Sequence, residues 1–178
     1  MEFNRKNTRL EFADYNNVGA YFITICTLSR KCILSEIVGT GVPDGPIVEL
    51  KKYGEIAEKF LIQLDSFYDN ISIDSYVIMP NHIHMILFIH DADVINAQDN
   101  EIEQNIIGCG ATKQNSIISK FISTFKRFCN KEIGVNIWQH RSYDHIIRNQ
   151  RDYDEHIRYI NENPIKWEND RFYGLKFE

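Results

Sequence analysis

The sequence predicts an α+β sandwich in which helices cover one face of an antiparallel sheet. Two observations lead to this prediction. Short β-branched and aromatic runs alternate with longer segments whose apolar residues recur every three or four positions, a pattern typical of strands and amphipathic helices. Their order is strand, helix, strand, strand, helix, strand, helix, and a βαββαβ core forms one sheet with its helices packed against it.

The first half of the chain supplies one strand, one helix and a hairpin. Residues 20–27 are a β-branched and aromatic run that ends before a polar stretch, so we expect a strand. Residues 71–79 and 82–90 are two more such runs, and the Pro80-Asn81 pair between them predicts a tight turn. Residues 47–68 predict the helix, with apolar side chains at helical spacing at Val48, Tyr53, Ile56, Ala57, Phe60, Leu61, Leu64 and Tyr68.

The second half supplies a loop, two helices and the last strand. Residues 91–114 are acidic and lack periodicity, which indicates a surface loop. A strand is expected within residues 136–148, and a short helix from Gln150 that stops at Pro164, because proline lacks the amide hydrogen that a helix needs. Before them, a helix beginning near Ser116 is predicted by apolar residues at Ile117, Ile118, Phe121, Ile122, Phe125, Phe128 and Cys129.

These elements specify a ferredoxin-like or RRM-like βαββαβ sandwich with an antiparallel sheet, followed by a C-terminal helix that carries Tyr159. The second face of the sheet is left for a ligand or an added helix. A chain of 178 residues fits one domain, so we expect residues 1–178 to form a single unit.

Composition narrows the class of protein. Apolar residues make up 43% and charged residues 25% of the chain, which is globular rather than disordered. No apolar stretch has the length of a membrane span, and residues 1–12 lack the plan of a signal peptide, so a cytoplasmic protein with no membrane partner is expected. The cysteines form no CxxC pair, and we expect reduced thiols at Cys26, Cys32, Cys109 and Cys129.

Charge is distributed unevenly along the chain. The formal net charge is −5, which by itself argues against a nucleic-acid partner. Residues 1–112 hold 8 Lys and Arg against 16 Asp and Glu, whereas residues 113–178 hold 12 against 9. The C-terminal third is therefore mildly basic, although such an asymmetry also arises by chance.

His82 and His84 are the sharpest chemical feature. Alternation along a strand places both imidazoles on one face and Ile83 on the opposite face, toward the core. Two neighbouring neutral imidazoles can bind one metal ion. An HxH triplet arises by chance about 0.2 times in a chain of this composition, so histidines without a ligand remain the ordinary alternative.

The last helix carries the second feature. Its core stripe is expected at Tyr153, Ile157 and Ile160, and a second stripe about 100° away holds His156, Tyr159 and Asn163. Tyr159 is therefore not needed for the core contact of the helix. The ordinary interpretation is a surface tyrosine and an asparagine that ends a helix before proline.

Three spans together resemble a known family. Residues 76–87 (YVIMPNHIHMIL), 137–149 (IWQHRSYDHIIRN) and 152–167 (DYDEHIRYINENPIKW) resemble the single-tyrosine HUH transposases, most closely the REP-associated tyrosine transposases. The HUH motif alone is loose. Its combination with WQ, YDHIIRN and YIxxNP at these distances is specific, and the resemblance covers nearly the whole chain.

The resemblance implies a metal-dependent transposase or endonuclease that cleaves and rejoins single-stranded or hairpin DNA, such as repetitive extragenic palindromes. His82, His84 and Asn163 would bind Mg²⁺ or Mn²⁺, and Tyr159 would be the nucleophile that forms a 5′-phosphotyrosine link. Two imidazoles and an amide suit manganese, nickel or zinc better than magnesium. The wider family contains helix-exchanging dimers, and its REP-associated branch acts as monomers, so a monomer and a homodimer both remain open.

Further residues are candidates for supporting roles. His145 and His156 would assist proton movement or orient ligands. Trp138 and Trp167 are expected to anchor the core rather than stack on bases. DNA phosphates would be guided by the basic residues of the last two helices and the last strand, which are Lys120, Lys126, Arg127, Lys131, Arg141, Arg148, Arg151 and Arg158. A solvated helix face is the ordinary alternative for each of these residues.

Two other functions compete with strand transfer. A non-catalytic nucleic-acid-binding module of RRM-like fold, such as a domesticated transposase, would use exposed aromatic residues on the central strands. A metal hydrolase that activates water would turn over DNA without any protein-DNA link.

Overall fold

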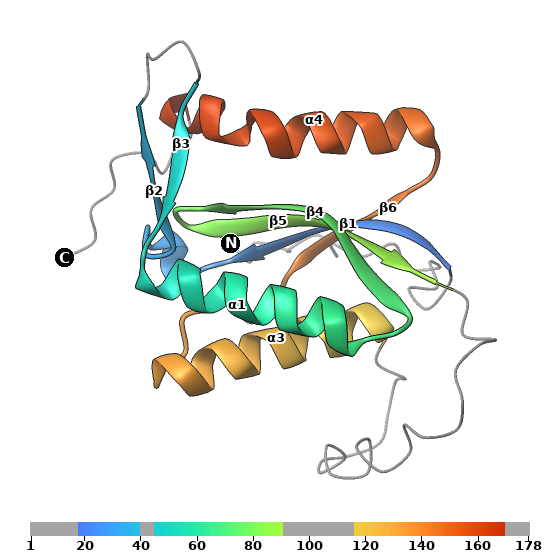
Figure 1. Cartoon of the computed structure of the whole chain (residues 1–178), viewed down its shortest axis with the longest axis horizontal. Coiled ribbons are helices and arrows are strands. Elements are labelled where there is room, and N and C mark those ends of the chain that lie inside the picture. The colour runs from blue at the N-terminus through green and yellow to red at the C-terminus, as the bar shows by residue number, and fades with distance from the viewer. Residues whose placement is uncertain (1–17, 40–44, 91–115, 170–178) are drawn as a thin grey trace, which may run out of the picture.

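The computed structural model describes residues 18–39, 45–90 and 116–169 and places a four-stranded antiparallel sheet at the centre of the fold (Figure 1). The strand order is β4-β5-β1-β6, so the first strand of the chain lies between the third and the last of the βαββαβ core. This arrangement confirms the predicted α+β class. The strands are β1 (Gly19–Cys26), β4 (Ile71–Met79), β5 (His82–Ile89) and β6 (Tyr143–Ile147).

Two helices cover one face of the sheet and form the main core with it (Figure 1). They are α1 (Lys52–Phe67) and α3 (Ile117–Ile133). Alternate residues of the central strands point toward these helices, and Ile23 and Ile83 are fully buried there. Trp138 and Trp167 are also buried, as expected of core anchors. The predicted loop at 91–114 and Cys109 lie outside the described residues.

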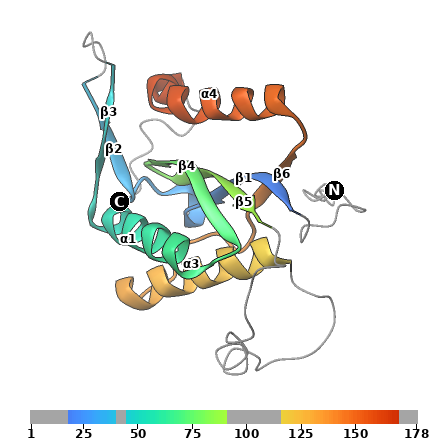
Figure 2. The same ribbon diagram turned by 45° about the vertical axis from the view of Figure 1, so that its right-hand side comes forward.

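Helix α4 (Gln150–Lys166) lies across the other face of the sheet (Figures 1 and 2). The prediction that this helix stops at Pro164 is wrong, because it continues to Lys166 with the proline inside its last turn. The Trp167 amide donates to the Pro164 carbonyl, and both side chains are buried. Burial of these apolar groups offsets the hydrogen bond that proline cannot make.

A small two-stranded sheet was not predicted. Strands β2 (Ser35–Val38) and β3 (Ile47–Leu50) pair with each other, and they stand together at one end of the molecule (Figure 2). The prediction of helix from residue 47 is therefore wrong, and Val48 lies in β3. The four-residue run IVEL is too short to distinguish a strand from a helical turn by its apolar pattern.

The last strand is shorter than the predicted span. β6 begins at Tyr143, and the preceding Trp138 makes only an isolated bridge to Thr27. Lys126 of α3 donates to the carbonyls of Gln139 and His140 in this connection. A side chain thus satisfies backbone groups that a longer strand would have paired.

Gly54 of α1 is required by close packing against the segment before β2. A Cβ added there would overlap the Leu34 carbonyl oxygen, which already accepts the Lys51 amide. We expect Gly54→Ala to lower the free energy of unfolding by about 2–4 kcal/mol, since backbone must move to admit the methyl group. Urea unfolding would measure this loss. Gln63→Ala, on the exposed side of α1, is the control and should change stability by less than about 0.5 kcal/mol.

The described helices include none that is both long enough and apolar enough to cross a membrane.

Candidate active site

The two histidines of HIH lie side by side on the sheet face that α4 covers. His82 and His84 are 4% and 5% exposed, and their ring centroids lie 4.4 Å apart. Ile83 between them is fully buried in the core on the opposite face. The predicted alternation of this strand is confirmed.

Hydrogen bonds orient both rings. His82 Nδ1 lies 2.6 Å from the Asn81 side-chain oxygen, which can only accept, so the proton is on Nδ1. His84 Nδ1 lies 2.8 Å from the Thr24 hydroxyl, and Thr24 is the direct cross-strand partner of His84. His84 Nε2 is buried and has no hydrogen-bond partner among the described residues. A proton on His84 Nδ1, donated to Thr24, would leave the Nε2 lone pair of His84 for a cation, as in metal sites whose histidines are held by their other nitrogen.

Burial keeps His84 neutral. Burial, then the proximity of His82, Arg30 and His156, lowers the pKa of His84 to about 2. A neutral imidazole is the form that binds metals. The burial of His84 therefore favours the neutral form of its ring, the form that a metal ligand requires.

This shift predicts a pH dependence of stability. Below the unfolded-state pKa of 6.5 the unfolded chain binds a proton that the folded chain excludes. His84 therefore stabilises the fold above pH 6.5, and this contribution is lost as the pH falls toward 2, by about 1.4 kcal/mol per pH unit. Urea unfolding of chelator-treated protein between pH 4.5 and 6 should show a shallower slope for His84→Gln than for the wild type. Equal slopes would mean that His84 is protonated in the folded state.

Helix α4 runs along β5 in the opposite chain direction. The Tyr153 hydroxyl donates to Asp74 of β4 at 2.7 Å, which fixes the first turns of the helix. Three ring contacts then follow the helix along the strand, between centroids of Tyr153 and Phe88 at 6.2 Å, Tyr159 and His84 at 5.0 Å, and Trp167 and His82 at 6.5 Å.

Tyr159 lies beside the histidine pair of its own chain. Its ring meets the His84 ring edge to face, and it also contacts the Phe22 ring at 5.9 Å. The residue is 45% exposed, whereas Ile160 beside it is buried. The structure thus brings together the predicted nucleophile and the predicted ligands, with the tyrosine open to solvent.

Asn163 is half-buried and lies one helical turn beyond Tyr159. Residues four apart share a face of a helix, so Asn163 falls between Tyr159, which contacts His84, and Trp167, which contacts His82. This placement brings its amide group to the same side of α4 as the two histidines.

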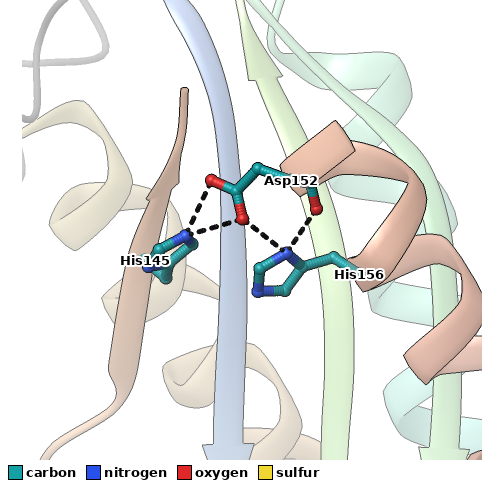
Figure 3. A group of neighbouring side chains, drawn as sticks. All are labelled: His145, Asp152 and His156. Atoms are coloured by element: carbon teal, nitrogen blue, oxygen red, sulfur yellow. Dashed lines mark hydrogen bonds and ion pairs between the residues drawn. The ribbon is translucent and has the colours of Figure 1, made fainter. Parts of the chain in front are cut away.

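His145 and His156 lie farther along the same sheet face. His145 Nε2 is 3.0 Å from one carboxylate oxygen of Asp152, and His156 Nδ1 is 3.2 Å from the other (Figure 3). The two rings stack with centroids 4.8 Å apart. Although burial opposes it, hydrogen bonds from His145 and from the Arg148 amide lower the pKa of Asp152. This group of His145, Asp152 and His156 is compatible with a divalent metal ion.

The predicted basic residues divide between the two faces of the sheet. Those of α3 lie on the helix that packs opposite α4 (Figure 1), so they are not brought to Tyr159. Burial lowers the pKa of Lys126 to about 8, and its ammonium group binds two backbone carbonyls. Arg127 lies over the Phe128 ring at 5.3 Å. The other two of this group are exposed at Lys120 and Lys131.

The remaining basic residues lie on α4 or at the ends of β6. Arg151 pairs with Glu155 at 3.0 Å on the exposed side of α4. Arg141, Arg148 and Arg158 are exposed, the first two on either side of β6 and the third next to Tyr159 in sequence. Arg158 is therefore on the helix that covers the histidine pair, whereas Arg141 and Arg148 lie at the two ends of the edge strand β6, which is separated from β5 by β1.

Sequence reasoning missed four residues that build this site, namely Phe22, Thr24, Asn81 and Asp152. Phe22 stacks on His84 at 5.1 Å and touches the His156 ring at 4.5 Å, so it lies between the two histidine groups. Asn81 had a local signal, because it precedes His82 directly in the turn. Phe22 and Thr24 had none, since their proximity to His84 depends on the pairing of β1 with β5.

Comparison with known proteins decides the family. No family model matches the chain. A Haemophilus influenzae protein named "Putative REP-associated tyrosine transposase" is 31% identical over 156 residues, which cover 86% of this chain and 74% of that protein. The chain belongs to the REP-associated tyrosine transposase family. The Escherichia coli K12 REP-associated tyrosine transposase is 29% identical over 94 residues, or 53% of this chain and 44% of that protein.

A solved structure agrees with the fold. The structure of a REP-associated tyrosine transposase bound to a REP hairpin superposes with a TM-score of 0.59, at 22% identity over 89% of this chain and 74% of that one. At 22% identity this similarity shows a shared fold. Membership of the REP-associated tyrosine transposase family indicates a DNA-processing role.

Proposed function

We propose that this protein cleaves and rejoins single-stranded DNA next to a hairpin, through a covalent link between Tyr159 and the 5′ phosphate. The observation that carries the proposal is the position of the Tyr159 ring, 5.0 Å from the ring of His84 in the same chain. A solvent-exposed phenol next to paired imidazoles suits attack on a phosphodiester. The hairpin is inferred from the relative of similar fold, which was solved with a REP hairpin.

The residues at the site fit a divalent cation. His84 Nε2 is buried without a hydrogen-bond partner among the described residues, and such an atom is costly unless it has a ligand. His82, His84 and Asn163 would hold the ion. When bound, the ion would neutralise charge on the phosphate oxygens. Mn²⁺ or Mg²⁺ is the expected ion from the family resemblance, and the imidazoles favour Mn²⁺ of the two.

Tyr159 would act as the nucleophile. Its hydroxyl oxygen would form a bond to phosphorus while the bond from phosphorus to the 3′ oxygen breaks. The phenol proton leaves, and the departing 3′ oxygen gains a proton to become a hydroxyl. Because the phosphotyrosine link keeps the number of phosphoester bonds unchanged, a 3′ hydroxyl can reverse the attack and rejoin strands without ATP.

The rest of the site would orient these groups. Thr24 and Asn81 fix the imidazoles through Nδ1, and Phe22 packs against both His84 and Tyr159. Arg141, Arg148 and Arg158 would bring phosphates to the exposed phenol. Since Tyr159 meets the histidines of its own chain, we propose that one copy of the chain completes one site.

The experiment is incubation of the protein with a single-stranded oligonucleotide that carries a hairpin, in Mn²⁺, labelled at either end in separate reactions. We expect a denaturation-resistant complex that retains the label 3′ of the cleavage point and whose peptide maps to residues 150–166. Cleavage without any protein-DNA link would instead support a hydrolase. Tight binding without cleavage in Mn²⁺, Mg²⁺ or Zn²⁺ would support the binding-module alternative, and both outcomes would overturn the proposal.

A further inference from the structure

A second group of ligand atoms lies on the same face of the sheet, apart from the histidine pair of β5. We propose that His145, Asp152 and His156 bind a divalent transition ion of the Zn²⁺, Co²⁺ or Ni²⁺ class, and that this ion ties α4 to β6. The inference does not depend on the proposed function, because it concerns residues outside the proposed nucleophile and its ligands.

The geometry of the three side chains supports the proposal. Their ligand atoms, His145 Nε2, His156 Nδ1 and the carboxylate oxygens of Asp152, all lie within 4.8 Å of one another (Figure 3). Two of the nitrogen-oxygen separations are 3.0 and 3.2 Å. Atoms that share an ion at bond lengths of about 2.0–2.2 Å lie about 3.0–3.4 Å apart. Only the two nitrogens have to approach each other for the three atoms to share an ion.

Independent contacts hold each ligand in place. His145 is positioned by β6, where it pairs with Phe22 of β1. The Asp152 carboxylate accepts a hydrogen bond from the Arg148 backbone amide. The Asp152 backbone amide donates to the side-chain oxygen of Asn149 at the start of α4. His156 follows one helical turn later on the same side of α4. The group is therefore assembled before any ion arrives, which lowers the cost of binding.

The donor set selects the class of ion. Two imidazoles and one carboxylate suit a borderline transition ion better than Mg²⁺ or Ca²⁺, which prefer oxygen. The side chains are 42%, 20% and 21% exposed for His145, Asp152 and His156, so an ion can enter with water completing its coordination. In the structure His145 Nε2 hydrogen-bonds to the carboxylate, whereas His156 Nδ1 lies 2.7 Å from the Asp152 backbone carbonyl oxygen and 3.2 Å from the carboxylate. A metal would take the place of the proton on each of these nitrogens.

The site lies close to the candidate active site but is separate from it. The Phe22 ring stands between them, 5.1 Å from the His84 ring and 4.5 Å from the His156 ring. His156 precedes Tyr159 by three residues on α4, and Phe22 touches Tyr159 as well. An ion at this group would hold the part of α4 that presents Tyr159, so the three ligands would act as positioning residues.

Metal stoichiometry tests the proposal. Tag-free protein is stripped with a chelator and titrated with Zn²⁺ by calorimetry, and the optical spectrum is recorded with Co²⁺. The variant His82→Ala/His84→Ala should still bind one equivalent, and Zn²⁺ should raise its Tm. Asp152→Asn introduced into this double variant should weaken Zn²⁺ binding at least tenfold, since the amide keeps the shape of the carboxylate without its charge. The matched control is Asp154→Asn in the same double variant, on the same helix but outside the group, and it should leave the affinity for Zn²⁺ unchanged.

Two results would overturn the proposal. One is the absence of Zn²⁺ and Co²⁺ binding in His82→Ala/His84→Ala when circular dichroism shows the variant folded. The other is binding that Asp152→Asn and His145→Gln/His156→Gln leave unchanged, which would place the ion on other residues such as His90 or His140. Failure of the DNA-cleavage experiment would leave these titrations interpretable, because they use no DNA.

Discussion

Replacing Tyr159 with phenylalanine should abolish the covalent complex with hairpin DNA, with a loss of at least about a thousandfold. Phenylalanine keeps the ring that packs against Phe22 and His84, so only the attacking oxygen is removed. The complex is measured on denaturing gels with end-labelled DNA. Tyr153→Phe is the matched control on the same helix. It removes the hydrogen bond to Asp74 and should leave the complex detectable.

Mixing two inactive variants tests whether one chain completes its own site. In the structure the Tyr159 ring contacts His84 of the same chain. A mixture of Tyr159→Phe with His84→Ala should therefore remain inactive. Recovery of the complex in the mixture would show that α4 is exchanged between two copies. Persistence of the complex in Tyr159→Phe alone would remove this residue from the role of nucleophile.

Replacing both His82 and His84 with alanine should reduce Mn²⁺-dependent formation of the complex at least about a hundredfold, because two ligands of the proposed ion are lost together. His90→Ala is the control. This histidine follows β5 and binds Ser72 at 2.7 Å, away from the pair, so its loss should have little effect.

A milder variant distinguishes the loss of the metal-binding imidazoles from the loss of their orientation. Thr24→Val removes the hydroxyl that binds His84 Nδ1 but keeps a β-branched side chain in β1. We expect a loss of about 10–100-fold, recovered in part at higher Mn²⁺ concentration, since partners of metal-binding histidines tune affinity by this amount. Activity that is independent of Mn²⁺ in the wild type would contradict the assignment of the histidine pair.

Local periodicity was enough to predict most of the fold. Alternation in HIHMILFI placed the two histidines on one face and Ile83 in the core, because successive side chains of a strand point to opposite faces. The spacing of apolar residues predicted a helix beginning near Ser116, and α3 begins at Ile117 with Ser116 as its N-cap. Weak local signals failed where long-range burial decided the outcome, as at Pro164 and in β3.

What the sequence determined by itself was therefore which side chains share an element and a face: His82 with His84 on a strand, and His156, Tyr159 and Asn163 on a helix. Family resemblance then suggested their chemistry. Only the tertiary structure decided that Tyr159 meets His84 of its own chain, that Thr24 orients that imidazole, and that His145 and Asp152 meet His156. The first two contacts join residues far apart in the chain, and the contact of His145 with α4 depends on how this helix packs on the sheet. Strand register and helix packing are not encoded by any short-range pattern.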